Sequence, residues 1–316
     1  MIHTGERYIN PLTDFGFKRI FGTPFNSDLL IGFLNALFDG ERVIKEVSYK
    51  NSEHFGYNES ERKAVFDVYC TTDTGARIIV EMQNVYQEFY KDRSIYYSTF
   101  PIAEQAKKGD WNYELNDVYT IGILNFAFPE DKKKDNRVTK IVKLMDKETK
   151  EVFYEKLTYI YVELEKFNKP LEECKSLYEK WLFCLRNMSN LLERPAELQG
   201  RVFERLFQAA EISKFNSRER RAYEQSVNAY RDIKNGMDSA RKEGLQKGIK
   251  QGLQQGLQQG LQQGIKQGIK QGLQQGFRQG EHNANLKNAK AMKAMGLPFE
   301  TIQKITGLTR EEIDNL

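Results

Sequence analysis

Apolar and polar positions along the first 215 residues switch between helical and strand-like spacing. Leu30, Phe33, Leu34 and Leu37 recur at helical spacing, and Asp39-Gly40 is a stop signal for this helix, predicted at 29–38. The segments that follow are either short β-rich runs or longer amphipathic stretches. They predict strands at 42–50, 63–70, 76–83, 118–128 and 158–164, and helices at 86–108, 171–188 and 195–215. The chain therefore begins with a helix, three strands, a helix and a strand.

The strands at 63–70 and 76–83 form a predicted hairpin with an acid in each strand. The connecting segment Asp73-Thr74-Gly75, with its glycine in the left-handed conformation, is a standard three-residue closure. Counting back from this loop along both strands sets Asp67 opposite Glu81. Opposed residues in a hairpin have Cβ atoms roughly 5 Å apart, so the two carboxylates are predicted to be neighbours.

Two carboxylates at that distance repel each other unless a cation lies between them. Gln83 follows Glu81 by two residues and points to the same face of the strand. A divalent ion such as Mg²⁺ takes one or two carboxylates and completes its shell with water and substrate phosphate. The hairpin therefore predicts a metal site. The alternative is that Asp67 is a buried structural acid and that Glu81 lies on a solvated face.

The composition excludes several classes of protein. Hydrophobic residues make up 40% and charged residues 29% of the 316 positions, and the net charge of +4 is too small to imply a nucleic-acid partner by itself. The three cysteines are widely spaced, which argues against disulfides or a zinc ribbon and for the reducing cytoplasm. The scattered histidines form no H-E-x-x-H motif. No apolar run approaches about 18 residues and no signal peptide is visible, so we expect a cytoplasmic protein without a membrane span.

Charge and glycine content divide the rest of the chain. The lysine-rich stretch 131–150 is interpreted as a solvated loop. A globular domain at 1–215, with a helical subdomain from about 171, is followed by a charged helical connector at 216–243, a tetrapeptide repeat at 244–280 and a small helical module at 281–316. In that last module Thr309 and Glu312 form a predicted capping box. Its basic and acidic residues balance, which favours an interaction module over a DNA-reading helix-turn-helix.

In the repeat, ten glycines recur at every fourth position from Gly244 to Gly280. On a helix, a period of four advances an apolar stripe by roughly 40° per unit, so a tight pairing needs right-handed supercoiling. Each glycine costs about 1 kcal/mol against alanine, which argues against an isolated helix. The five basic residues and the absence of acids allow contact with phosphates as a minor role. We expect a flexible tether or a weak oligomerising segment.

Several motifs, in order along the chain, resemble one known family. The helix-β-β-β-helix-β order with Glu-x-Gln in the third strand is similar to the PD-(D/E)XK nuclease superfamily. More closely, the motifs are similar to the Rpn family of recombination-promoting nucleases, also labelled transposases, in which glycine-repeat tails are common. The motifs are Asn10-Pro-Leu-Thr-Asp-Phe-Gly-Phe-Lys-Arg-Ile-Phe21, Phe66-Asp-Val68, Val80-Glu-Met-Gln83, Arg93-Ser-Ile-Tyr-Tyr97 and Tyr161-Val-Glu-Leu-Glu-Lys-Phe167.

This resemblance implies a restriction-endonuclease-like α/β fold, with a mixed α-β-β-β-α-β sheet flanked by helices and an α-helical C-terminal extension. It makes Asp67 and Glu81 metal ligands, helped by the main-chain carbonyl of Met82. Gln83 takes the place of the usual lysine, where it can orient a water but carries no charge. Asp14 corresponds to the acid of the superfamily's first helix.

Two further residues are candidate phosphate contacts, Lys18 near Asp14 and Arg93 in the helix after the hairpin. A structural role for Arg93 is equally compatible with its position. The implied function is a Mg²⁺- or Mn²⁺-dependent DNA endonuclease that acts in recombination or mobile-element biology. The alternative is a catalytically weak or inactive DNA-binding or oligomerising protein that retains the fold. Homo-oligomers through the repeat and the C-terminal helices are also expected.

Overall fold

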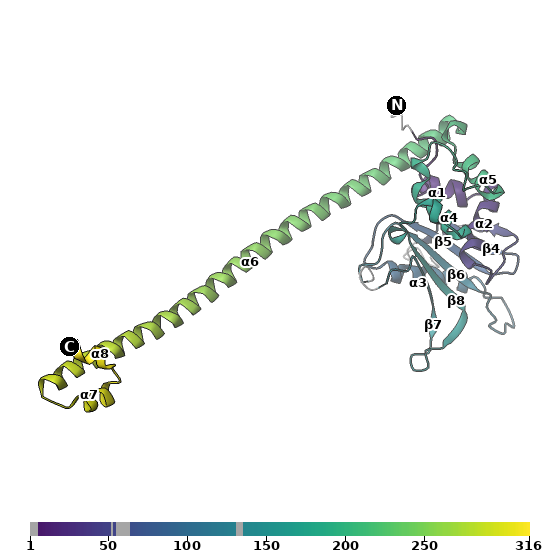
Figure 1. Ribbon diagram of the computed structural model, residues 1–316. Helices are drawn as coiled ribbons and strands as arrows, with labels where there is room; N and C mark the ends of the chain where they lie inside the picture. Colours follow the sequence, from purple (N-terminus) through teal and green to yellow (C-terminus); the bar gives the residue numbers. More distant parts are fainter. Residues whose placement is uncertain (1–5, 52, 55–63, 131–134) are drawn as a thin grey trace. The chain divides into compact units, whose positions relative to one another are not determined.

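The computed structural model describes residues 6–51, 53–54, 64–130 and 135–316. A six-stranded mixed sheet with the spatial order β1-β4-β5-β6-β8-β7 forms its centre (Figure 1). β1, β4 and β5 pair antiparallel, β5, β6 and β8 pair parallel, and β7 pairs antiparallel with β8. The strands are β1 (Val47–Tyr49), β4 (Val68–Thr72), β5 (Arg77–Gln83), β6 (Val118–Leu124), β7 (Thr139–Met145) and β8 (Val152–Glu163), with a separate ladder of β2 (Glu53–His54) and β3 (Ala64–Val65).

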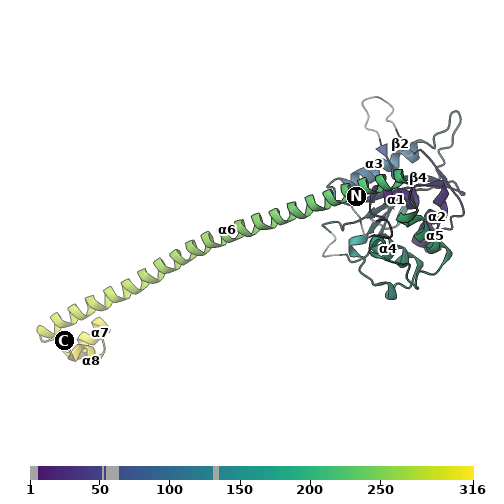
Figure 2. The ribbon, with the colours of Figure 1, turned by 90° about the horizontal axis from the view of Figure 1, so that it is seen from above.

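Helices cover both faces of this sheet. α1, α2, α4 and α5 lie on one face, and α3 lies on the other (Figures 1 and 2). They are α1 (Asp14–Phe21), α2 (Ser27–Phe38), α3 (Tyr90–Ala103), α4 (Leu177–Asn187) and α5 (Arg201–Ala210). Single 3-10 turns lie between them at Pro24–Asn26, Leu164–Lys166, Leu171–Glu173, Met188–Asn190 and Ile212–Lys214. This is the mixed α/β arrangement that the sequence predicts.

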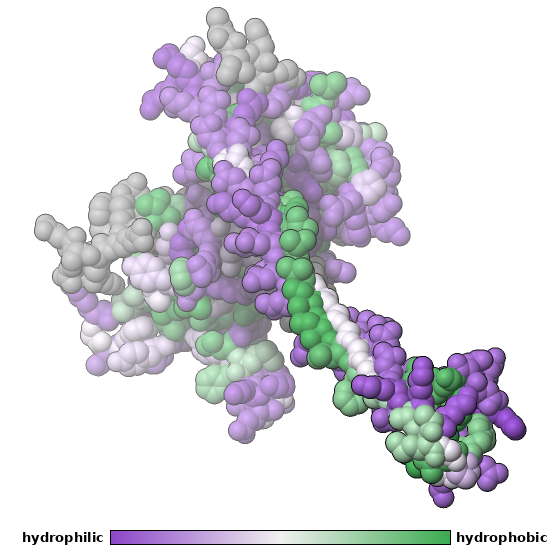
Figure 3. Space-filling model, turned by 90° about the vertical axis from the view of Figure 1, so that its left-hand side faces the viewer, coloured by the Kyte–Doolittle hydropathy of each residue, from purple (hydrophilic) through white to green (hydrophobic). Residues whose placement is uncertain are grey.

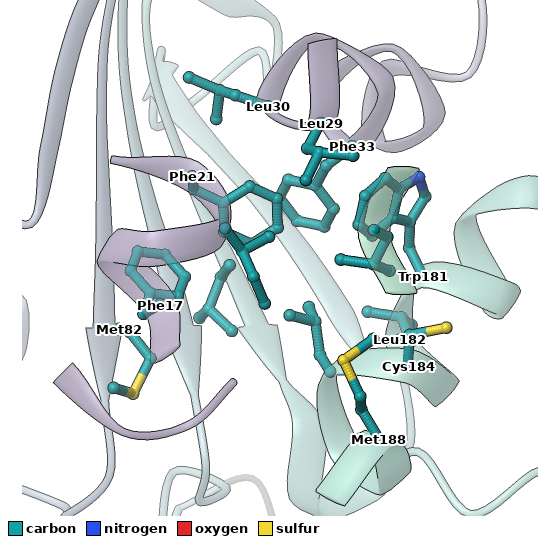
Figure 4. Close-up of a cluster of buried hydrophobic side chains, with 14 of the residues drawn as sticks. Phe17, Phe21, Leu29, Leu30, Phe33, Met82, Trp181, Leu182, Cys184 and Met188 are labelled. Carbon is teal, nitrogen blue, oxygen red and sulfur yellow. The ribbon is translucent and has the colours of Figure 1, made fainter. Parts of the chain in front are cut away.

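Successive side chains along each strand point to opposite faces of the sheet and therefore pack against different helices. On β5, Val80 and Met82 point into the main core under α1, α2, α4 and α5, whereas Ile79 and Glu81 point to the α3 face. Figure 4 shows the main core, in which the rings of Phe21 and Trp181 lie with centroids 5.8 Å apart. Burial of each large apolar side chain stabilises the fold by about 1.5–3 kcal/mol. The sheet and its helices thus present different chemistry on the two faces.

The predicted hairpin has the predicted register. β4 and β5 pair with Val68 opposite Val80, and continuing that register by one residue sets Asp67 opposite Glu81. Gly75 adopts the left-handed conformation expected of it, with φ of 83°. The first strand is not continuous, however. It breaks at a bend that contains Asp67, between β3 and β4.

The prediction of a solvated loop over 131–150 is wrong where β7 lies. β7 occupies Thr139–Met145 within this stretch, and β8 begins at Val152 rather than at residue 158. Most β7 side chains are partly or fully exposed, with Ile141 57% exposed, because β7 is an edge strand. Lys140 and Lys143 stand there among β-branched and other apolar residues, so the local charge concealed a strand pattern.

Other predicted elements exist but are shorter than expected. β1 covers only Val47–Tyr49 of the predicted strand 42–50. α3 begins at Tyr90 rather than at residue 86. α4 begins at Leu177, where Ser176 and Glu179 form a capping box. α5 starts after Gly200. These starts are set by caps and turns that the apolar period alone does not reveal.

The chain divides into two compact units between Gly236 and Met237. Helix α6 (Ser217–Ala294) contributes to both. Its first turns pack against the sheet domain, with Tyr223 and Val227 buried in the main core. The predicted domain end at residue 215 precedes this division because residues 216–236 are polar overall and bury few side chains. The finer division into a connector, a repeat and a C-terminal module stays a prediction.

In the second unit the repeat is helical, contrary to the expectation that its glycines prevent an isolated helix. Leucine, glutamine and lysine, which fill most other positions, are good helix formers. An exposed apolar residue follows nine of the ten glycines, and these residues form the green stripe beside the pale glycine stripe in Figure 3. α7 (Phe299–Thr306) and α8 (Arg310–Asp314) pack around Ala289 and Ile302. The capping box of Thr309 and Glu312 is confirmed.

Candidate active site

Asp67 and Glu81 are fixed by hydrogen bonds that cross between their strands. The main-chain N–H of Asp67 donates to Oε1 of Glu81 at 3.1 Å, and the N–H of Met82 donates to Oδ2 of Asp67 at 2.8 Å. The second bond exists because the chain bends at Asp67, so that its carboxylate meets the N–H of Met82 on β5. Glu81 is only 5% exposed. The two acids that the sequence predicts as neighbours are therefore held together by backbone on both sides.

Burial and mutual repulsion disfavour the charged form of this pair. Burial raises the pKa of Asp67, against the main-chain hydrogen bond from Met82 and the charges of Lys18 and Arg93, which lower it. Burial, followed by the charge of Asp67, raises the pKa of Glu81 to about 8. A bound cation would relieve both effects. The pair is thus electrostatically arranged for a positive charge.

The donor set fits a hard divalent ion. Among the described residues none donates a hydrogen bond to Oδ1 of Asp67 or Oε2 of Glu81, so each acid keeps one oxygen. The N–H and C=O of a strand residue point to the same edge, so the carbonyl of Met82 lies on the side of Asp67. Across the described ranges no cluster of three or more His, Cys, Asp or Glu side chains has metal-site geometry. Two carboxylates, a carbonyl and water suit Mg²⁺.

A tight loop places Asp14 and Lys18 at the same site. The Thr13 hydroxyl donates to the carbonyl of Asn10 at 2.8 Å and accepts from the N–H of Gly16 at 3.0 Å, which caps α1. A Cβ on Gly16 would lie 2.1 Å from the Asn10 carbonyl oxygen, so the loop requires glycine there. The Asn-Pro-x-Thr-Asp-Phe-Gly motif therefore forms the loop and the N-terminal cap with which α1 begins at the site.

Asp14 and Lys18 form an ion pair across one turn of α1, with Nζ 2.7 Å from Oδ1. Burial alone would lower the pKa of Lys18, but the hydrogen bond to Asp14 and the charges of Asp14, Asp67 and Glu81 raise it. The lysine therefore stays charged beside the acid pair. The Asp14 side chain is 67% exposed and engaged with Lys18.

A cleft of about 680 Å³ brings most of the predicted residues together. Asp14, Lys18, Asp67, Met82 and Gln83 all line it. The neighbouring Asn84 donates to the carbonyl of Leu12 at 2.6 Å, which ties the end of β5 to the loop before α1. The side-chain amide of Gln83 bonds to none of the residues that the structure describes, so it is free to bind water in the cleft.

Arg93 lies on α3, with its guanidinium 5.1 Å from the centre of the Tyr90 ring. Its Nη1 donates to Oε1 of Gln87 at 2.8 Å, whereas Nε and Nη2 are buried without a hydrogen-bond partner in the described part of the chain. Its charge also acts on Asp67 and Glu81. Arg93 thus brings a positive charge to the acid pair, but its two unpaired nitrogens are buried and it does not line the cleft, so the structure does not present them to a phosphate.

One wall of the cleft was not predicted from the sequence. The start of α6 contributes Ala222, Gln225, Ser226, Ala229, Tyr230 and Ile233. The Ser226 hydroxyl accepts from the N–H of Phe15 at 3.0 Å, and the Tyr223 hydroxyl accepts from the N–H of Asn10 at 2.9 Å. The helical spacing of Tyr223, Val227 and Tyr230 was the available signal. It is weak because charged residues surround these three.

A family model described as PD-(D/E)XK nuclease family transposase matches residues 11–240. The chain belongs to that family. Members of PD-(D/E)XK nuclease families generally use divalent metal ions, and the family supports a nuclease- or transposase-like role for this chain. The resemblance predicted from the motifs, and the restriction-endonuclease-like fold class, are thereby confirmed. The match ends close to the division after Gly236, so the family domain includes the first turns of α6. No curated protein and no solved structure matches.

No helix in the described residues is long and apolar enough to cross a membrane.

Proposed function

We propose that this PD-(D/E)XK family chain is a DNA endonuclease that depends on Mg²⁺ or Mn²⁺ and acts in recombination or mobile-element biology. The observation that carries the proposal is the buried pair of Asp67 and Glu81, cross-bonded through backbone and with one oxygen of each left for a ligand. In a nuclease family, a pair of this kind beside a lysine and an open cleft fits phosphodiester hydrolysis.

In this proposal Asp67, Glu81 and the Met82 carbonyl hold the ion. When bound, a divalent ion supplies a hydroxide-like nucleophile and stabilises the charge that develops on phosphorus. Gln83 orients the attacking water through its free amide. Lys18, held by Asp14, supplies the positive charge that lysine at position 83 would supply in other PD-(D/E)XK enzymes.

DNA is the proposed partner, and its backbone is expected to follow the cleft. The Lys18 ammonium lines the cleft and would contact a phosphate there, and Arg93 would add its positive charge beside the acid pair. We also propose the cytoplasm as the location, because the three cysteines are buried free thiols.

Supercoiled plasmid incubated with the purified chain and Mg²⁺ or Mn²⁺ tests the proposal. We expect nicked and linear products with wild type, and a loss of at least about 100-fold in rate with Asp67→Asn or Glu81→Gln. Glu155→Gln is the matched control, since Glu155 is an exposed carboxylate 67% accessible on β8. Equal cleavage by wild type and both acid variants would show a contaminant and refute the proposal.

The second candidate, a DNA-binding protein with little catalysis, draws support from the uncharged Gln83. Gln83→Lys separates the two. A catalytic site that lacks only a charge should cleave faster after the substitution, whereas a binding protein should change its DNA affinity without gaining cleavage. DNA affinity is measured by fluorescence anisotropy at fixed salt.

We further propose that the repeat associates with a second copy of the chain. Nine apolar residues are exposed along it, namely Leu245, Ile249, Leu253, Leu257, Leu261, Ile265, Ile269, Leu273 and Phe277. Each lies beside a glycine, so an apolar ridge runs next to a shallow groove and the surface is complementary to itself (Figure 3). Four of the five basic residues occupy the third position of the unit, turned away from this face.

Light scattering of the full chain tests the association. Replacement of Leu253, Leu257 and Leu261 by glutamine should lower the mass in solution and leave plasmid cleavage intact. An unchanged mass would refute association through this stripe.

A further inference from the structure

The strand next to β5 carries a glycine beside Glu81. In the parallel pairing of β5 with β6, Glu81 lies opposite Gly122, and Gly122 lies opposite Tyr161 on β8. Partners in register on parallel strands point to the same face, so these three positions face α3. Tyr161 confirms the direction, since its hydroxyl bonds to the Ser94 hydroxyl of α3 at 2.7 Å. Gly122 therefore leaves a gap between two side chains.

The hydroxyl of Tyr90 fills that gap. A Cβ on Gly122 would lie 2.4 Å from the Tyr90 hydroxyl oxygen, so any other residue at this position would displace the hydroxyl. Glu81 lies on the neighbouring strand in register with Gly122, and its negative charge acts on the Tyr90 phenol. The first residue of α3 thus reaches over β6 to the flank of the acid pair.

The Tyr90 hydroxyl is a proton donor without a partner among the described residues. The two tyrosines of β8 on this face are satisfied by α3, because Tyr161 bonds to Ser94 and Tyr159 bonds to Ser98 at 2.8 Å. Burial, and next the negative charge of Glu81, raise the pKa of Tyr90, so the phenol stays protonated. Glu81 is the residue of β5 in register with Gly122, so its carboxylate is the acceptor nearest in register.

We propose that Tyr90 is a positioning residue that donates a hydrogen bond to the Glu81 carboxylate and holds it in the orientation that binds the metal ion. Because Gly122 has no side chain, the hydroxyl has room beside Glu81. This inference rests on the proposed metal site of Asp67 and Glu81. A carboxylate oxygen has two lone pairs, so one oxygen can accept from Tyr90 and still bind the ion. Such partners of metal ligands typically contribute 10- to 100-fold to metal affinity.

The test is Mn²⁺ binding to the full chain, measured through the electron paramagnetic resonance signal of the free ion. We expect Tyr90→Phe to weaken Mn²⁺ binding about tenfold. In plasmid cleavage the same variant should raise the half-saturating Mn²⁺ concentration by a similar factor and leave the rate at saturation unchanged. Tyr161→Phe is the matched control, because it removes a buried hydroxyl from the same face that bonds to Ser94 instead, and it should bind Mn²⁺ as wild type does.

Gly122→Ala provides an independent route to the same effect, since its methyl group displaces the Tyr90 hydroxyl. It should weaken Mn²⁺ binding about tenfold alone and add no further loss to Tyr90→Phe. Wild-type affinity in Tyr90→Phe would overturn the inference, whether or not Gly122→Ala folds. Failure of the metal site itself is distinguishable, because wild type would then bind Mn²⁺ no better than Asp67→Asn.

Discussion

Glycines in the two parts of the chain lie in opposite surroundings. A Cβ on Gly16 or Gly122 would lie 2.1 Å or 2.4 Å from a neighbouring oxygen, so a methyl group at either position would displace another part of the chain. A Cβ on any of the ten repeat glycines would meet nothing within 4 Å. In the sheet domain, unusual residues are thus explained by the fold itself. In the repeat they are not, which directs attention to a partner outside the chain.

The largest effect on folding is expected at Gly16. Gly16→Ala forces a methyl group against the Asn10 carbonyl and the Thr13 hydroxyl, both of which belong to the loop that starts α1. The free energy of unfolding should fall by about 3 kcal/mol. Urea unfolding monitored by the fluorescence of buried Trp181 measures it. A loss below about 0.5 kcal/mol would remove the contrast between the two sets of glycines.

A smaller effect is expected at the acid pair in the metal-free protein. Folding raises the pKa of Glu81 from its ordinary value of 4.5 to about 8. The folded state therefore binds more protons, and this stabilisation is complete below about pH 4.5 and is lost as the pH rises through 8. Glu81→Gln should remove that loss, so its free energy of unfolding at pH 8 should exceed that of wild type by about 2 kcal/mol.

Denaturant unfolding at pH 5 and pH 8 with EDTA checks this, and Glu155→Gln should behave as wild type. If Glu81→Gln destabilises the metal-free protein at pH 8, burial and the charge of Asp67 do not raise the pKa of Glu81.

The smallest effect of a single substitution on stability is expected in the repeat. Replacement of Gly252, Gly256 and Gly260 by alanine should stabilise the helix of a monomeric chain by about 1 kcal/mol per site, since no atom within the chain is displaced. Amide hydrogen exchange should slow across this segment. Self-association should weaken, because methyl groups fill the groove. Slower exchange with an unchanged mass in solution would separate the helix from the proposed interface.

The parts of the site that sequence predicts are local. The register of Asp67 and Glu81 follows from the loop that ends in Gly75, and the side-chain direction of Gln83 follows from strand geometry. In each case the deciding contacts join residues close in the chain or joined by one turn.

The parts that sequence does not predict depend on distant contacts. Asp67 lies at a bend where its carboxylate accepts from the N–H of Met82, and no local pattern distinguishes that bend from a continuous strand. The α6 wall of the cleft requires Ser226 to meet Phe15 across most of the domain sequence. Tyr90 reaches Gly122 only because α3 packs over β6. Packing of one element on another decides these contacts.

Iron-directed cleavage of the full chain tests whether Asp67 and Glu81 hold a metal ion. Fe²⁺ bound in place of Mg²⁺ generates hydroxyl radicals with ascorbate and peroxide, which cut the backbone next to the ion. We expect fragments that end near Asp67 and near Glu81, suppressed by excess Mg²⁺ and absent in Asp67→Asn. Cuts elsewhere, or cuts at these positions that persist in Asp67→Asn, would contradict a metal site built on this pair.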